Sequence, residues 1–145
     1  PYCEELAKAI TNEIRRGNRI DTTTKLRNVI EKTLDFLPNN KEKKDIIKKT
    51  CQRTFQALRI DVNNEFEVLY EFMEKLPGAL KPGGRVAILT FHSGEDKLVK
   101  KALKAGYKEG IYSEYARDVV RPSAQECVQN GRARSTKMRW AVKAE

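Results

Sequence analysis

The chain has 145 residues, which suffices for one ordinary domain, or a small domain with an appendage, and argues against two full domains. Hydrophobic residues make up 39% and charged residues 34%, a balance typical of a globular protein, which excludes a low-complexity tail. The formal net charge of +9 favours an anionic partner such as RNA or DNA, although charge alone identifies none.

The first part of the chain is predicted to be helical. Apolar side chains recur at helical spacing over residues 2–16, and Gly17 provides a suitable C-terminal stop. A second amphipathic stripe follows, for which either Asp21 or Thr22 can serve as N-cap, and Pro38 ends it. A third helical pattern extends over residues 41–76, so the first half of the chain contains no predicted strand.

The character of the sequence changes after this helical region. Residues 81–84 combine one proline with two glycines and predict a tight turn. Residues 85–91 form an almost continuous apolar run, typical of a strand buried on both faces in a parallel sheet. Residues 93–96 fit a capping box for a helix that ends at Gly106. This order predicts an α/β fold.

The C-terminal segment predicts shorter elements. Val119 and Val120 suggest a short strand, and Ser123 can cap a short helix. Residues 138–143 alternate apolar and basic side chains, as an exposed edge strand does. We therefore expect a late pair of strands to close one edge of the sheet.

The segment Thr90–Ser93 is the first candidate for a functional site. Ligands of open α/β sheets gather at the carboxyl ends of strands, which is where this segment lies. The structural alternative gives each residue an ordinary role: Phe91 packs under the next helix, Ser93 is an N-cap, and His92 is a surface loop residue. The sequence shows no partner for His92.

Other site types find little support. Three cysteines and a single histidine, widely spaced, form neither a disulfide framework nor a tetrahedral zinc site, so no metal site is expected. The chain has no phosphate-binding glycine motif and no plausible Ser/His/Asp set. The longest apolar run, residues 86–89, is too short to cross a bilayer, and no leader opens the chain, so we expect a cytoplasmic protein.

Residues 131–140 concentrate positive charge around small side chains. Guanidinium groups in such a segment suit bidentate contacts with phosphate. An equally good explanation is a strand edge that charge protects against aggregation. The sequence leaves both alternatives open.

Several segments together resemble one family, the bacterial 16S rRNA cytosine-N4 methyltransferases of the MraW or RsmH type. Their order and spacing agree with the family over nearly the whole chain, and the matching segments are Thr23–Thr24 with Leu26, Arg53–Ile60, Val62–Asn63 with Glu65, Leu80–Arg85, Phe91–Ser93, Glu95–Asp96, Val99–Lys100, Arg121–Ser123, Asn130, Arg132–Ser135 and Lys137. Two departures are Gly94, where the family usually has Leu, and Gly131, where it usually has Pro.

The resemblance implies a Rossmann-like methyltransferase sheet with a helical domain inserted into it. Residues 1–58 would be the later part of that insertion, and residues 59–145 the C-terminal part of the Rossmann-like domain. Residues 85–91 would form the fifth strand of the sheet. Enzymes of this type move a methyl group from S-adenosylmethionine to the exocyclic N4 amine of a cytosine in small-subunit ribosomal RNA.

The resemblance also assigns candidate site residues. Phe91, His92 and Ser93 would line the substrate side of the cleft, next to a flipped cytosine. The residues that would hold rRNA phosphates, or brace the tail by pairing with acidic residues inside the fold, are Arg53, Arg59, Arg132, Arg134 and Lys137. The family's cofactor turn, ribose-binding acid and amine-holding loop lie upstream of every segment matched here, so the S-adenosylmethionine site is expected to be absent from this chain.

Two functions therefore remain in view. The chain is either the C-terminal part of such an enzyme, inactive alone, or a non-catalytic RNA-binding or assembly module that keeps part of the fold. In both cases an exposed sheet edge would favour self-association or a partner chain.

Overall fold

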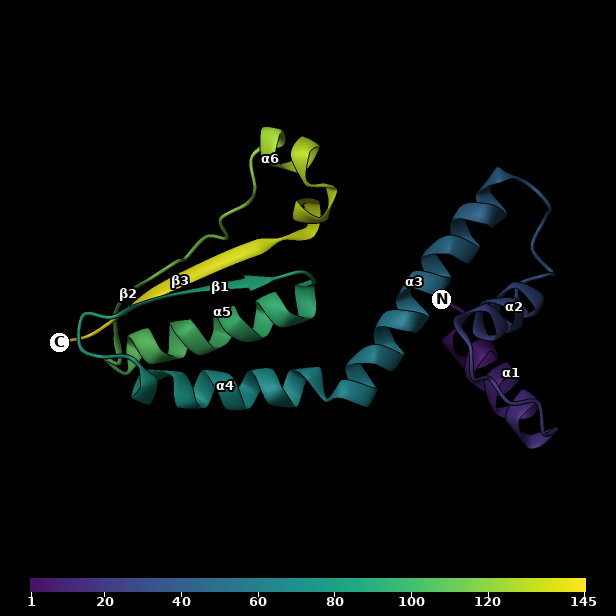
Figure 1. Cartoon of the computed structure of the whole chain (residues 1–145), viewed down its shortest axis with the longest axis horizontal. Coiled ribbons are helices and arrows are strands. Elements are labelled where there is room, and N and C mark those ends of the chain that lie inside the picture. The colour runs from purple at the N-terminus through teal and green to yellow at the C-terminus, as the bar shows by residue number, and fades with distance from the viewer. The chain divides into compact units, whose positions relative to one another are not determined.

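The computed structural model describes all residues, 1–145, and they form two compact units, Pro1–Asn63 and Asn64–Glu145 (Figure 1). Each unit has a hydrophobic core of its own. The units divide after Asn63, whereas the boundary predicted from the sequence lies after residue 58. The assignment of the first segment to an inserted helical domain stays a prediction.

The first unit consists of three helices: α1 (Cys3–Arg15), α2 (Thr23–Thr33) and α3 (Lys41–Asn63). Thr22 is the N-cap of α2, because its hydroxyl accepts a hydrogen bond from the Lys25 N–H at 3.2 Å, which decides between the two predicted caps. Partly buried side chains of α1, of α3 and of the connecting segments pack around four buried ones, Leu6, Leu26, Ile30 and Leu34. The predicted helical character of this region is confirmed.

The second unit combines three helices and one 3-10 helix with a small sheet. Its elements are α4 (Glu65–Ala79), β1 (Arg85–Thr90), α5 (Ser93–Lys108), β2 (Tyr112–Tyr115), α6 (Ala124–Gln129), η1 (Gly131–Ser135) and β3 (Lys137–Lys143). The strands are ordered β1-β3-β2, and both pairings are antiparallel. The mixed α/β class is confirmed, and membership of β1 in a larger Rossmann-like sheet stays a prediction.

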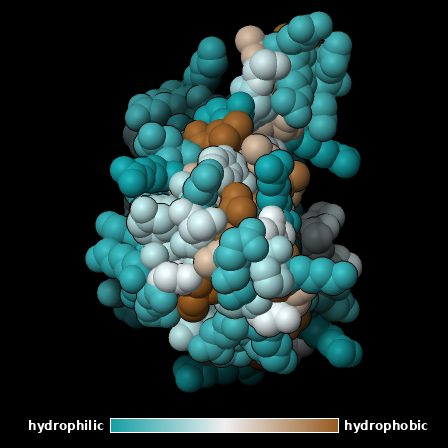
Figure 2. All heavy atoms as spheres, turned by 90° about the vertical axis from the view of Figure 1, so that its left-hand side faces the viewer, coloured by the Kyte–Doolittle hydropathy of each residue, from teal (hydrophilic) through white to brown (hydrophobic).

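The helices α4 and α5 cover one face of the sheet, as Figure 1 shows. Met73 and Leu76 of α4 and Val99 and Leu103 of α5 share a core with Ala141 of β3. Hydrophobic burial on this face is what holds the second unit together. Figure 2 shows one end of the molecule, where hydrophilic side chains predominate and hydrophobic ones emerge only in separate patches.

The prediction that the 85–91 strand is buried on both faces is wrong for this chain. Val86 and Ile88 of β1 are half-buried against the helices, whereas Ala87 is exposed and Leu89 is 59% exposed. Burial alternates along the strand because no layer covers its other face. β1 is also an edge strand, with β3 as its one neighbour. An apolar run alone does not reveal which face is covered.

Two further expectations about strands are corrected. β3 is the central strand of the sheet and not an exposed edge, because β1 and β2 pair with its two sides. Val120 forms no strand of its own but a single bridge to Met138, with hydrogen bonds of 2.9 and 3.0 Å between the two backbones. The alternating basic residues of β3 therefore do not protect an edge.

The turn before β1 is as predicted. The Gly84 N–H donates to the Lys81 carbonyl at 2.8 Å, and Gly83 has a φ of 71°, which suits glycine. The predicted end of the next helix at Gly106 is wrong, because α5 continues to Lys108. Gly106 lies inside the helix, where the ring of Tyr112 packs directly on its backbone.

Candidate functional site

The site begins at the carboxyl end of β1, where the chain passes through Phe91 and His92 into α5. His92 is the N-cap of this helix: its Nδ1 accepts a hydrogen bond from the Glu95 N–H at 3.4 Å. The Glu95 carboxylate reaches back and accepts the Phe91 N–H at 3.0 Å. The two hydrogen bonds form a capping box that starts one residue earlier than predicted, with His92 in place of Ser93, except that the reciprocal bond comes from Phe91, the residue before the cap, and not from the cap itself.

The box fixes the conformation of the loop. Phe91 is left 55% exposed, and Ser93 is exposed as well. The prediction that Phe91 packs under α5 is wrong, because Phe91 is more than half exposed and does not belong to the core that α5 covers. The side chain of His92, in contrast, is only 15% exposed.

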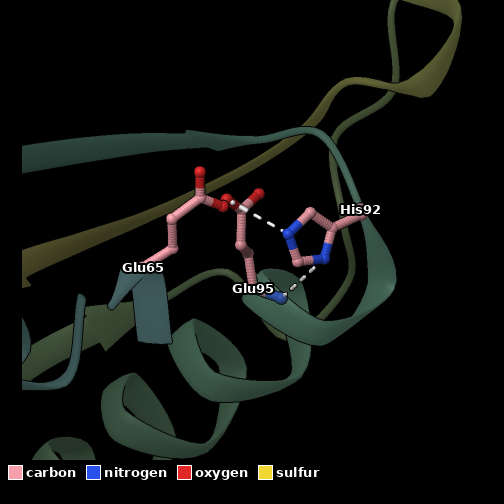
Figure 3. Close-up of side chains that lie close together, drawn as sticks. All are labelled: Glu65, His92 and Glu95. Carbon is pink, nitrogen blue, oxygen red and sulfur yellow. Dashed lines mark hydrogen bonds and ion pairs between the residues drawn. The ribbon is translucent and has the colours of Figure 1, made fainter. Parts of the chain in front are cut away.

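A second helix contributes to the same place. Glu65, in the first turn of α4, has its carboxylate close to His92 and Glu95, and one ligand-type atom from each residue lies within 4.8 Å of the other two (Figure 3). The two carboxylates and the imidazole point toward one another from the N-terminal ends of α4 and α5. Helix N-termini stabilise negative side chains, which accounts for a glutamate at either position.

One nitrogen of the imidazole makes no hydrogen bond within the fold. Nε2 of His92 is buried and makes no hydrogen bond, although Oε1 of Glu95 lies 3.3 Å away. This distance permits an ion pair when the imidazole is protonated, drawn as a dashed line in Figure 3, but the two groups are not aligned for a hydrogen bond. The Phe66 ring packs edge-on against the imidazole, with 5.7 Å between ring centroids.

The structure also explains the departure at Gly94. A Cβ atom at this position would lie 2.7 Å from Cζ of Phe66 and 3.2 Å from Nδ1 of His92. The space beside Gly94 is thus filled by the Phe66 ring. Gly94 lies in the first turn of α5, and its lack of a side chain lets the aromatic ring pack closely.

A buried ion pair joins α5 to the centre of the sheet. Arg139 of β3 donates from Nε to one oxygen of Asp96 at 2.7 Å and from Nη2 to the other at 3.2 Å. Its Nη1 donates to the carbonyls of Ala116 and Arg117 at 3.4 and 3.3 Å. The hydrogen bonds from Arg139 lower the pKa of Asp96 from its usual value, against the opposing effect of burial.

The basic candidates fall into both units. Arg53 and Arg59 are exposed on α3 in the first unit. Arg132 and Arg134 are exposed on η1, and Lys137 begins β3 opposite Thr90, the last residue of β1. Of the five, Lys137 is thus placed beside the carboxyl end of β1, immediately before the Phe91–His92 loop.

Three of these relationships were not predicted from the sequence. His92 was treated as a residue without a partner, although the spacing of three residues to Glu95 is the signal of a capping box. Other basic residues were expected to pair inside the fold, whereas Arg139 does so with Asp96. Nothing in the sequence brings Glu65 next to His92, because helix packing alone produces that contact.

Comparison with known proteins gives the chain its family. The model of the MraW methylase family matches residues 1–144, nearly the whole length. The chain belongs to the MraW methylase family. Methyltransferases of this family depend on S-adenosylmethionine in general.

Individual relatives carry closely similar names. Ribosomal RNA small subunit methyltransferase H 1 of Agathobacter rectalis is 88% identical over 145 residues, which are all of this chain and 41% of that protein. The protein of the same name from Lachnoclostridium phytofermentans is 71% identical over 144 residues, which are 39% of its length. Ribosomal RNA small subunit methyltransferase H 2 of Acholeplasma laidlawii is 50% identical over 142 residues, which are 41% of its length. The chain spans less than half the length of these relatives.

Proposed function

We propose that this chain is the C-terminal part of an S-adenosylmethionine-dependent methyltransferase that acts on the N4 amine of a cytosine in 16S rRNA. The observation that carries the proposal is the 88% identity, over the whole chain, to a protein named ribosomal RNA small subunit methyltransferase H 1. A cytoplasmic location follows from the proposed substrate. None of the helices is long and apolar enough to span a membrane.

The geometry of the loop supports a substrate-side role for Phe91, His92 and Ser93. Phe91 is 55% exposed at the carboxyl end of β1, where ligands of α/β folds bind, and an exposed aromatic ring can stack on an unpaired base. The capping box of His92 and Glu95 holds the loop in one conformation. In methyl transfer to an amine, such positioning supplies much of the rate enhancement.

The cofactor site is proposed to lie outside this chain. The motifs that would hold S-adenosylmethionine in the family have no counterpart in residues 1–145, and the open face of β1 is consistent with further protein packing there. We therefore expect the chain by itself to be inactive. β1 also has an unpaired edge, where we expect self-association or binding of a partner chain.

Isothermal titration of the chain with S-adenosylmethionine tests this proposal. We expect no saturable heat up to millimolar ligand. Binding with a micromolar dissociation constant would show that the cofactor site is contained in residues 1–145. Light scattering of the same samples, at increasing concentration, checks the expected self-association.

An alternative function is a non-catalytic RNA-binding module. It is favoured by the exposed Arg132 and Arg134 on η1 together with the formal net charge of +9. The enzyme proposal predicts that full-length relatives lose methyl transfer when the residue aligned with Phe91 is changed to Ala, whereas rRNA binding changes little. The alternative predicts that rRNA binding is lost when Arg132 and Arg134 are changed to Ala, and that the change at Phe91 has no effect on binding.

A further inference from the structure

We propose that Glu65, His92 and Glu95 form a binding site for one divalent transition-metal cation, of the Mn²⁺ or Zn²⁺ class. The inference is independent of the proposed methyl transfer. It rests on the convergence of two carboxylates and one imidazole. Glu65 comes from the N-terminal end of α4, and His92 and Glu95 come from the N-terminal end of α5. None of the three residues is fully exposed.

The spacing of the donor atoms suits a metal ion. Bonds of about 2.0–2.2 Å in a tetrahedral arrangement put neighbouring ligand atoms roughly 3.3–3.6 Å apart. Nε2 of His92 and Oε1 of Glu95 are 3.3 Å apart, and the Glu65 oxygen lies within 4.8 Å of the other ligand atoms. A small rotation of the Glu65 side chain would complete a three-ligand site with at least one open position.

The missing hydrogen bond of the imidazole nitrogen is a second observation about this cluster. Nε2 of His92 is buried without a hydrogen bond, and burying an unsatisfied polar atom is unfavourable unless a partner compensates it. Glu95 Oε1, although close, is not aligned to be that partner. A metal ion placed between Nε2 and the two carboxylates would satisfy this atom.

The chemistry of the donor set limits the choice of ion. One imidazole with two carboxylates suits Mn²⁺, Zn²⁺ and similar ions, whereas Mg²⁺ and Ca²⁺ prefer oxygen ligands alone. The cysteines do not take part, since Cys3 and Cys51 lie in the first unit and neither they nor Cys127 belong to the cluster.

The position of the imidazole proton must change when the ion binds. Nδ1 accepts the Glu95 N–H at 3.4 Å, so neutral His92 carries its proton on Nε2 in the metal-free protein. Coordination through Nε2 moves this proton to Nδ1, and the cap hydrogen bond is given up. That hydrogen bond is long, and the box keeps its second one, from the Phe91 N–H to Glu95 Oε2 at 3.0 Å.

A bound ion would join the N-terminal end of α4 to that of α5. Both helices already share the core of the second unit through Met73, Leu76, Val99 and Leu103. The ion would add a link at the end of the helices that carries the Phe91–His92 loop. The expected consequence is a stiffer loop and a higher melting temperature in the presence of the metal.

The single histidine of the chain makes a direct test possible. We would titrate the whole chain with MnCl2 and follow the ring proton resonances of His92 by NMR, because paramagnetic Mn²⁺ broadens nearby nuclei. The free Mn²⁺ signal in electron paramagnetic resonance gives the stoichiometry. We expect one saturable site and selective broadening of the His92 resonances below one equivalent of metal.

Matched variants separate this site from nonspecific binding. Glu65→Gln and Glu95→Gln keep side-chain size and, because each removes a direct ligand, should weaken Mn²⁺ binding by at least the roughly 10-fold to 100-fold that loss of an outer-shell partner costs. Glu67→Gln changes an exposed glutamate of the same helix α4 and should bind as the wild type does. The proposal is overturned by nonsaturable binding, by unaffected His92 resonances in the wild type, or by Glu65→Gln binding Mn²⁺ normally. The wild-type NMR result decides the matter even where a variant fails to fold.

Discussion

The guanidinium of Arg139 holds both carboxylate oxygens of Asp96, at 2.7 and 3.2 Å, and so connects the central strand β3 to the first turn of α5. The side chains of Arg139 and Asp96 are only 6% and 15% exposed. Arg139 also binds the carbonyls of Ala116 and Arg117, so one side chain connects three segments of the second unit. The loop that carries Phe91 and His92 lies immediately before the helix anchored in this way.

Loss of this pair should destabilise the second unit strongly. Removing one partner of a buried ion pair leaves the other charge uncompensated and costs about 3–5 kcal/mol. We expect Arg139→Met to lower the free energy of unfolding by that order. Urea unfolding followed by the fluorescence of Trp140, the single tryptophan and a residue of β3, measures it. The double variant Arg139→Met with Asp96→Leu should recover most of the loss, and an equal loss in both variants would contradict the explanation.

The same pair predicts an acid-sensitive stability. The pKa of Asp96 is lowered in the folded protein, mainly by hydrogen bonds from Arg139. The contribution of Asp96 to the free energy of unfolding is therefore complete above the unfolded-state pKa of about 3.9. It is lost as the pH falls through the lower, folded-state pKa. Unfolding free energies measured by Trp140 fluorescence between neutral pH and acid should decrease in this window. Asp96→Asn should start less stable and show a shallower decrease, whereas parallel curves would count against this assignment.

Two helical glycines should respond in opposite directions to alanine. A Cβ at Gly106 would lie 2.6 Å from the ring of Tyr112, which is buried at 3% exposure, so overpacking should cost about 1–3 kcal/mol. Gly78 in α4 has nothing within 4 Å of its position, so Gly78→Ala should be neutral or stabilise by up to about 1 kcal/mol. Chemical unfolding of the two variants compares them directly. Equal effects would show that helix propensity, and not packing against Tyr112, decides.

The exposed arginines of η1 should contribute to RNA affinity through phosphate. Replacing Arg132 and Arg134 with Ala should weaken binding of a small-subunit rRNA fragment and reduce the slope of log affinity against log salt by roughly 0.7–0.9 for each phosphate that is no longer neutralised. Fluorescence anisotropy at several salt concentrations measures both quantities. Lys108→Ala is a suitable control, since Lys108 is an exposed cation at the far end of α5. Identical slopes in wild type and variant would exclude these arginines from the interface.

Much of the local structure could be predicted from the sequence. Helical spacing, the glycine turn before β1 and the polar cap of α2 are properties of neighbouring residues, and the structure confirms them. The family motifs were also recognisable because they are short, ordered segments, and the family match over residues 1–144 agrees with them. What remains a prediction is the role of Phe91, His92 and Ser93.

The tertiary structure decided the points that depend on distant partners. β3 was expected at an edge, but its position in the centre depends on pairing with both β1 and β2. β1 was expected to be buried on both faces, but one layer of helices covers one face only. The helix cap fell on His92 and not on Ser93, because the hydrogen bond from Phe91 to Glu95 sets the register.

By itself, then, the sequence determined the helices, the turn, the strand that leads into Phe91–Ser93, and the family. These follow from patterns within a few residues or from motifs in order along the chain. Only the tertiary structure placed Glu65 beside His92, and Arg139 against Asp96 across 43 positions of sequence. Such pairings depend on how helices and strands pack in three dimensions, because the sequence around a charged residue or a histidine does not indicate which distant residue it will contact.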